Sequence, residues 1–100
     1  MSIRHVVMWR LAGDTSSAKA ANAQLVKDAL LPLVGKLPEI VSMTLHDNIV
    51  DEARNADLIL ISEFATLEDL QAYQVHPDHV AAAAVIREAT TDRVVGDWEQ

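Results

Sequence analysis

The chemically richest stretch of this sequence runs Tyr73-Gln74-Val75-His76-Pro77-Asp78-His79 and holds the only tyrosine and two of the four histidines. Pro77 restricts the residue before it to extended geometry, so a helix that reaches Val75 should end by His76. Pro77 also suits the first position of a following helix. His79 is then expected in the first turn, where the helix dipole favours neutral imidazole over imidazolium. Neutral imidazole is a base or a hydrogen-bond acceptor, although Asp78 beside it has the opposite effect.

A purely structural role is the alternative for the same stretch. In that interpretation His76 caps a kink between two helices, His79 is a solvated surface residue and Tyr73 belongs to the core. A metal site is not expected, because two histidines three residues apart in a chain without cysteine fall short of the usual ligand count.

Four strands are expected to frame this stretch, at residues 3–11, 40–50, 58–64 and 93–98. The first strand places His5, Val7, Trp9 and Leu11 on one face and Arg4, Val6, Met8 and Arg10 on the other. Both faces carry bulky apolar groups, so the middle of this strand should be covered on both sides. The third strand is a continuous apolar run and should be central. Trp9 and Trp98 are expected in the core or at an interface.

Helices are expected after the first and third strands. The first begins near Asp14, Thr15 or Ser16 and ends or kinks at Pro32. Its apolar stripe is predicted from residues three or four apart: Ala18, Ala21, Leu25, Ala29 and Leu33, widened by Val26, Leu30 and Val34. Thr66 is the predicted N-cap of the helix that ends before Pro77.

The resulting order is βαββαβ with the second α split in two. It predicts one α+β domain over residues 1–100, with a ferredoxin-like four-stranded antiparallel sheet and helices on one face. A monomer would leave the other face, with its large aliphatic side chains, in water. Two copies related by a two-fold axis could cover that face, so a homodimer is predicted.

The composition limits the classes of partner that this protein is expected to bind. The formal net charge of -7 argues against nucleic acid, which needs a basic face. The longest wholly apolar run, residues 80–86, is too short to span a bilayer, and no secretory leader is expected. A cytoplasmic protein without a membrane partner is therefore predicted. The absence of cysteine excludes disulfides and thiolate chemistry.

Three segments together resemble the stress-responsive A/B barrel domain (Dabb) family. They are Ile3-Arg4-His5-Val6-Val7, Ser62-Glu63-Phe64 and the run from Ala72 to His79 that contains His-Pro-x-His. The resemblance covers nearly the whole chain and implies a homodimeric α/β barrel formed by two packed sheets. It agrees with the element order deduced from the residues.

The resemblance also implies a site. Plant polyketide cyclases of this family close a linear poly-β-ketone by aldol condensation, using a strand histidine, a helix tyrosine and the second histidine of His-Pro-x-His. The matching positions are His5, Tyr73 and His79, which makes them the expected catalytic residues. His76, Val7 and Trp9 are the expected substrate-binding residues. The sequence departs from the cyclases after His79, where alanines fill positions that shape their pocket.

The chemistry implied for this set needs no cofactor and acts on a hydrophobic or aromatic carbonyl compound. His79 would remove a proton alpha to the carbonyl, Tyr73 would hydrogen-bond the enolate, and His5 would orient the chain or shuttle a proton. Cyclase-like or isomerase-like activity is one hypothesis for this small-molecule-binding protein. A non-enzymatic stress-responsive dimer and a cofactor-free monooxygenase-like barrel are the alternatives.

Overall fold

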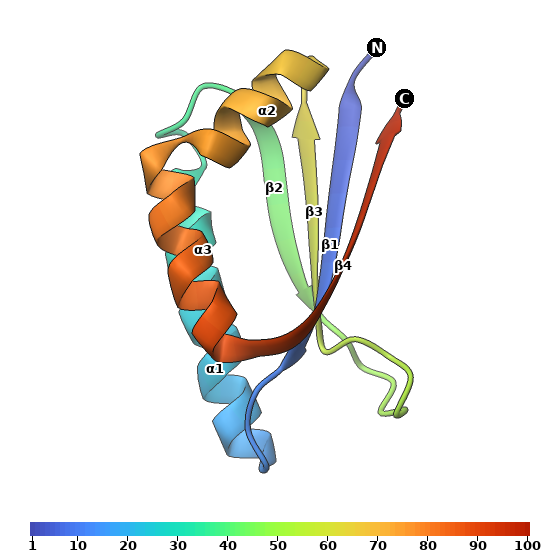
Figure 1. Ribbon diagram of the computed structural model, residues 1–100. Coiled ribbons are helices and arrows are strands. Elements are labelled where there is room, and N and C mark those ends of the chain that lie inside the picture. The colour runs from blue at the N-terminus through green and yellow to red at the C-terminus, as the bar shows by residue number, and fades with distance from the viewer.

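The structure is a computed structural model that describes residues 1–100, and its elements follow the predicted βαββαβ order (Figure 1). The elements in chain order are β1 (Ile3–Leu11), α1 (Ser16–Leu30), the 3-10 turn η1 (Leu31–Leu33), β2 (Ile40–Asp47), β3 (Leu58–Phe64), α2 (Leu67–Val75), α3 (Pro77–Ala89) and β4 (Thr90–Glu99). The ferredoxin-like α+β fold is confirmed. None of the helices combines the length and the apolar character that a membrane-spanning helix needs.

The four strands form one antiparallel sheet in the order β2-β3-β1-β4. The apolar run of β3 fits its central position, as the sequence predicted, and β1 is the other central strand. The three helices cover one face of the sheet, and β4 diverges from α3 toward the chain terminus (Figure 1). The core fills the space between the helices and the inner face of the sheet.

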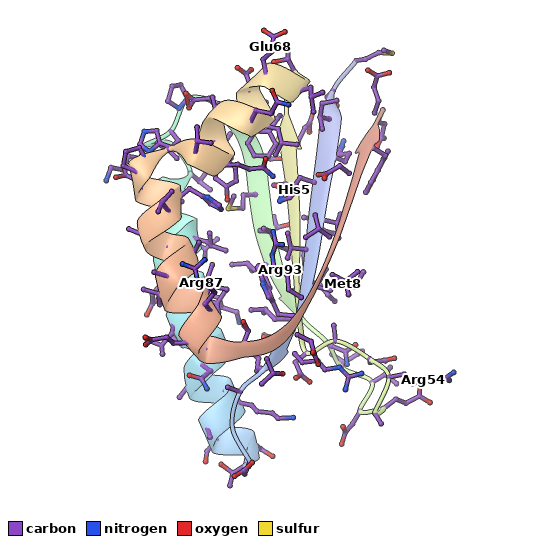
Figure 2. The ribbon with its side chains drawn as sticks, in the orientation of Figure 1. His5, Met8, Arg54, Glu68, Arg87 and Arg93 are labelled. Carbon is purple, nitrogen blue, oxygen red and sulfur yellow. The ribbon has the colours of Figure 1, made fainter.

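The two faces of β1 have different surroundings within the single chain. Val7 and Trp9 on the inner face are buried beneath the helices. Met8 lies on the outer face, away from the helices, and is 40 % exposed (Figure 2). Within the single chain, the helices therefore cover the inner face of β1, as predicted. Cover of the outer face by a second copy stays a prediction.

The stripe predicted for α1 was wrong in part. The buried residues of this helix are Ala23, Val26 and Leu30, followed by Leu33 in η1, whereas Leu25 is exposed. Two apolar stripes overlap on this helix, and the buried one carries the larger side chains. It is favoured because the free energy of burial grows with apolar area.

Two strand boundaries also differ from the prediction. β2 ends at Asp47, and an irregularity in its pairing with β3 between Ile40 and Ser42 leaves Val41 exposed. β4 begins at Thr90, three residues before the predicted start, because α3 ends at Ala89 and passes directly into the strand. The Thr90 hydroxyl donates to the Ile86 carbonyl at 2.8 Å, which satisfies one of the last carbonyls of the helix.

The junction between α2 and α3 has the predicted geometry. The Thr66 hydroxyl accepts a hydrogen bond from the backbone N–H of Asp69 and caps α2. His76 lies between the helices, and its Nδ1 accepts from the N–H of Asp78 at 3.0 Å, so its imidazole caps α3. Pro77 occupies the first turn of α3. This break orients α3 so that its N-terminal turn lies beside the end of α2.

Candidate functional site

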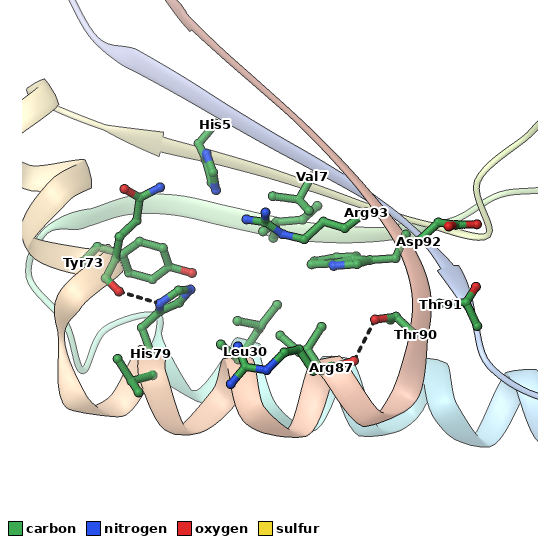
Figure 3. Close-up of a pocket in the computed structure, with 16 residues that line it drawn as sticks. His5, Val7, Leu30, Tyr73, His79, Arg87, Thr90, Thr91, Asp92 and Arg93 are labelled. Carbon is green, nitrogen blue, oxygen red and sulfur yellow. Dashed lines mark hydrogen bonds between the residues drawn. The ribbon is translucent and has the colours of Figure 1, made fainter.

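His79 lies in the first turn of α3, as predicted, and is anchored to the end of α2. Its Nδ1 donates a hydrogen bond to the backbone carbonyl of Gln74 at 3.0 Å (Figure 3). Because a carbonyl oxygen only accepts, the proton of the neutral ring is on Nδ1. Nε2 therefore carries the free lone pair, which is the form that a general base requires.

Tyr73 is a core residue that also reaches the site. It is only 1 % exposed, and its ring lies 5.0 Å from the Phe64 ring and 4.4 Å from the His79 ring, measured between centroids. Burial raises the pKa of Tyr73 to about 12. The hydroxyl therefore keeps its proton at neutral pH and can donate a hydrogen bond, as an oxyanion would require.

His5 is oriented by a carboxylate on the neighbouring strand. The β1–β4 register places His5 opposite Asp97, and His5 Nδ1 lies 2.5 Å from a carboxylate oxygen of Asp97. This bond fixes the orientation of a ring that is 3 % exposed. The other ring nitrogen, Nε2, is left without a protein partner.

These three residues line one cavity of about 550 Å³ between α3 and the inner face of the sheet, named here the histidine cavity (Figure 3). Such a volume suits a small organic ligand. Val7 and Trp9 also line it, whereas His76 does not. The full lining consists of His5, Val7, Trp9, Leu30, Leu60, Tyr73, Gln74, His79, Val80, Ala83, Ile86, Arg87, Thr90, Thr91, Asp92 and Arg93.

The electrostatics of the cavity favour neutral His79. Burial lowers the pKa of His79, the hydrogen bond to the Gln74 carbonyl raises it, and the charges of His5 and Arg93 lower it further, with a net lowering. The sequence left the net direction of this pKa shift open, because the helix dipole and Asp78 have opposite effects; the structure adds burial as the main cause of the lowering. The Asp78 carboxylate pairs instead with Lys36 at 3.1 Å.

We expect the titration of His79 to show this shift directly. Its imidazole signals in NMR should titrate below pH 6.5, the ordinary value for histidine. Because the unfolded state then binds the proton more readily, the contribution to stability is complete above pH 6.5. It is lost as the pH falls through the lower folded pKa. A folded pKa of His79 at or above that of the unfolded chain would contradict this expectation.

Several side chains at the site were not predicted from the sequence. Asp97 is 92 residues from His5 along the chain, and only the strand register brings the two together. Arg87 and Arg93 line the cavity from α3 and β4. The alternation of β4 was a usable signal for Arg93 and Asp97, since residues two apart on a strand share a face. No group of three or more His, Asp or Glu side chains is arranged to hold a metal ion.

A four-stranded antiparallel sheet with helices on one face, and a histidine–tyrosine cavity beneath them, defines a small α+β domain of the ferredoxin-like class. Residues 3–100 match the model of the Stress responsive A/B Barrel Domain, and the chain belongs to this family.

Relatives of known sequence or structure agree with this assignment. The stress-response A/B barrel domain-containing protein DABB1 of Arabidopsis thaliana is 26 % identical over 96 residues, which cover 96 % of this chain and 46 % of the relative. The chain thus spans about half the length of that relative. A dimeric protein of ferredoxin-like fold from Bacteroides fragilis has a TM-score of 0.86 at 28 % identity, covering 99 % of this chain and 96 % of its own. A dimeric ferredoxin-like protein from Thermobifida fusca has a TM-score of 0.82 at 28 % identity, covering 100 % and 92 %.

Proposed function

We propose that this chain binds a small carbonyl compound in the histidine cavity and performs acid–base chemistry on it. The observation that carries the proposal is the anchored His79, whose Nδ1–H is held by the Gln74 carbonyl while Tyr73 packs against the same ring. Both residues line the cavity together with His5. The arrangement supplies a base, a hydrogen-bond donor and a second imidazole within one small volume.

In the proposed step, His79 Nε2 takes a proton from the carbon alpha to a carbonyl, and the electron pair of the C–H bond moves to form the enolate. The protonated hydroxyl of Tyr73 donates a hydrogen bond to the enolate oxygen. His5, oriented by Asp97, positions the ligand or shuttles the proton. Where the enolate is conjugated with a C=C bond, return of the proton from His79 to the distal carbon gives isomerisation. Attack of the enolate carbon on a second carbonyl of the same molecule, with the His79 proton passing to the new alkoxide, gives cyclisation.

Deuterium uptake by acetophenone tests this step without knowledge of the natural substrate. In D₂O the protein should accelerate exchange of the methyl protons, measured by ¹H NMR, above the buffer rate. His79→Ala should lower the accelerated rate by about 10²–10⁴, the usual contribution of a general base. Tyr73→Phe should also lower it, because the enolate loses its donor.

His46→Ala is the matched control, since this exposed histidine contacts Thr44 at the surface and lies outside the cavity. It should exchange like wild type. Exchange at the buffer rate in the presence of wild-type protein would overturn the catalytic proposal. It would favour the alternative of a non-enzymatic stress-responsive protein. The other alternative, a cofactor-free monooxygenase-like barrel, stays a prediction. No contact in the histidine cavity favours that chemistry.

We further propose that the chain is a homodimer whose outer sheet faces pack against each other. The β1–β4 register places Val94 and Trp98 beside Met8 and Arg4 on this face, and Ile61 of β3 lies on it too. Val94 is 65 %, Trp98 48 % and Ile61 37 % exposed in the single chain. The similar Bacteroides and Thermobifida structures are dimeric, which supports a homodimer for this chain.

A further inference from the structure

Most, but not all, of the basic side chains in this acidic protein form ion pairs with carboxylates. Five of the eight Lys and Arg residues pair with carboxylates, namely Arg4, Arg10, Lys19, Lys27 and Lys36. The remaining three, Arg54, Arg87 and Arg93, have no carboxylate partner within 4.0 Å. Two of these three line the histidine cavity, whereas Arg54 lies on the loop between β2 and β3, away from the helices (Figure 2).

The two cavity arginines come from opposite walls. Arg87 is in the last turn of α3, and Arg93 is on β4 opposite Trp9, on the inner face of the sheet. Figure 3 shows both side chains extending along the cavity toward the end that holds Tyr73 and His79. Arg93 is close enough to His79 for its charge to lower the pKa of that imidazole.

The carboxylates near the cavity do not neutralise these arginines. Asp92 lies 3.7 Å from Arg10, and Asp97 is bound to His5. The histidine cavity therefore holds two free guanidinium groups in a chain whose net charge is -7. A guanidinium presents a planar fork of donors that matches a carboxylate, and an ion pair with such geometry is directional as well as attractive.

The histidine cavity also has an apolar lining and one buried hydrogen-bond donor without a partner. Trp9, Leu60 and Ile86 provide buried apolar surface for the body of a ligand. The indole N–H of Trp9 has no hydrogen-bond partner in the protein, although Trp9 is only 3 % exposed. A buried donor without a partner is costly, and Trp9 is one of the residues that line the cavity.

We propose that the histidine cavity selects a carbonyl compound that carries a carboxylate on an apolar body, and that Arg87 and Arg93 bind this carboxylate. The inference rests on the proposed function for the role of the carbonyl, but the binding of the carboxylate is a separate property. With the carboxylate held at the arginines, the carbonyl end of the ligand extends toward His79 and Tyr73.

A pair of isosteric probes tests the charge preference. 4-Acetylbenzoate and 4-acetylbenzamide share a ring and an acetyl group and differ in the charge of one substituent. Calorimetry at fixed pH should give a Kd for the benzoate about ten-fold lower than for the amide, as expected for hydrogen bonds to a charged group. Higher ionic strength should reduce this preference, because the arginines are at the open side of the cavity.

Substitution should locate the preference. Arg87→Gln and Arg93→Gln should each reduce the ratio of the two Kd values, and the double variant should bind both probes alike. Arg54→Gln is the matched control and should keep the ratio of wild type. Circular dichroism confirms that each variant is folded. Equal binding of both probes by wild type, no binding of either, or a loss of preference in Arg54→Gln would each overturn the proposal.

This outcome is separable from that of the proposed function. If the benzoate is preferred but no deuterium enters its methyl group, the carboxylate site stands and the catalytic proposal falls. If exchange depends on His79 while both probes bind alike, the catalytic proposal stands and the carboxylate site falls.

Discussion

Met8→Glu should convert the proposed dimer into a monomer. Wild type is expected to sediment as a particle of about 22 kDa at micromolar concentration, twice the 11.0 kDa chain. Met8 lies near the middle of the outer sheet face, so in a two-fold interface each substitution is present twice. Two carboxylates would then lose their water, which costs several kcal/mol each, because Arg4 and Arg10 on the same face already pair with Glu63 and Asp92. The variant should sediment near 11 kDa or aggregate through its remaining apolar face.

Leu25→Glu provides the matched control for this experiment. Leu25 is on α1 and is 49 % exposed, similar to Met8, but it lies on the helical side of the molecule. The same charge introduced there should leave the particle mass of wild type unchanged. A wild-type protein that remains a soluble monomer at micromolar concentration would show that the outer face needs no second copy.

Phe64→Ala should cost about 3–5 kcal/mol of the free energy of unfolding, the usual loss for a fully buried phenylalanine. Phe64 has no exposed surface, and its ring packs against Tyr73 at 5.0 Å and lies 6.4 Å from the His5 ring. Its removal leaves a void directly beneath the candidate site. Urea unfolding at a fixed protein concentration measures the loss, since a dimer makes stability depend on concentration.

Leu67→Ala is the comparison for this core substitution. Leu67 begins α2 and is 54 % exposed, so its truncation should cost well under half as much. A loss below about 1 kcal/mol for Phe64→Ala would mean that the core collapses around the void instead of retaining it. In that case the Tyr73 ring would have moved toward the space that Phe64 filled.

The strands and the helix junction could be predicted because they depend on local signals. The alternation of β1, the apolar run of β3, Thr66 as a cap and Pro77 as a helix start all act within a few residues. His79 could be placed in a first turn for the same reason. The side of α1 that is buried could not be predicted, because two stripes compete and the sheet beneath decides between them.

Only part of the candidate site could be predicted from the sequence. Tyr73 and His79 were singled out by their residue types and by the helix boundary at Pro77, but only the family resemblance added His5 and joined the three into one site. The partners that orient them depend on contacts between distant segments: Asp97 reaches His5 through strand pairing, and Arg93 faces the cavity through the register of β4 with β1. Burial as the cause of the lowered pKa of His79 likewise requires the packed structure.

The exposure of β4 has a consequence for how this protein can diversify. Its residues from 91 onward are exposed, and it forms hydrogen bonds with one neighbouring strand only, whereas His5 and Tyr73 are embedded in the core. Arg93 can therefore be exchanged for a neutral or acidic residue at little cost to folding, while His5 and Tyr73 cannot be changed so freely. In the proposed site, ligand preference and proton transfer would reside in parts of the molecule with unequal tolerance to mutation. Selection, natural or in the laboratory, can alter the first repeatedly without rebuilding the second.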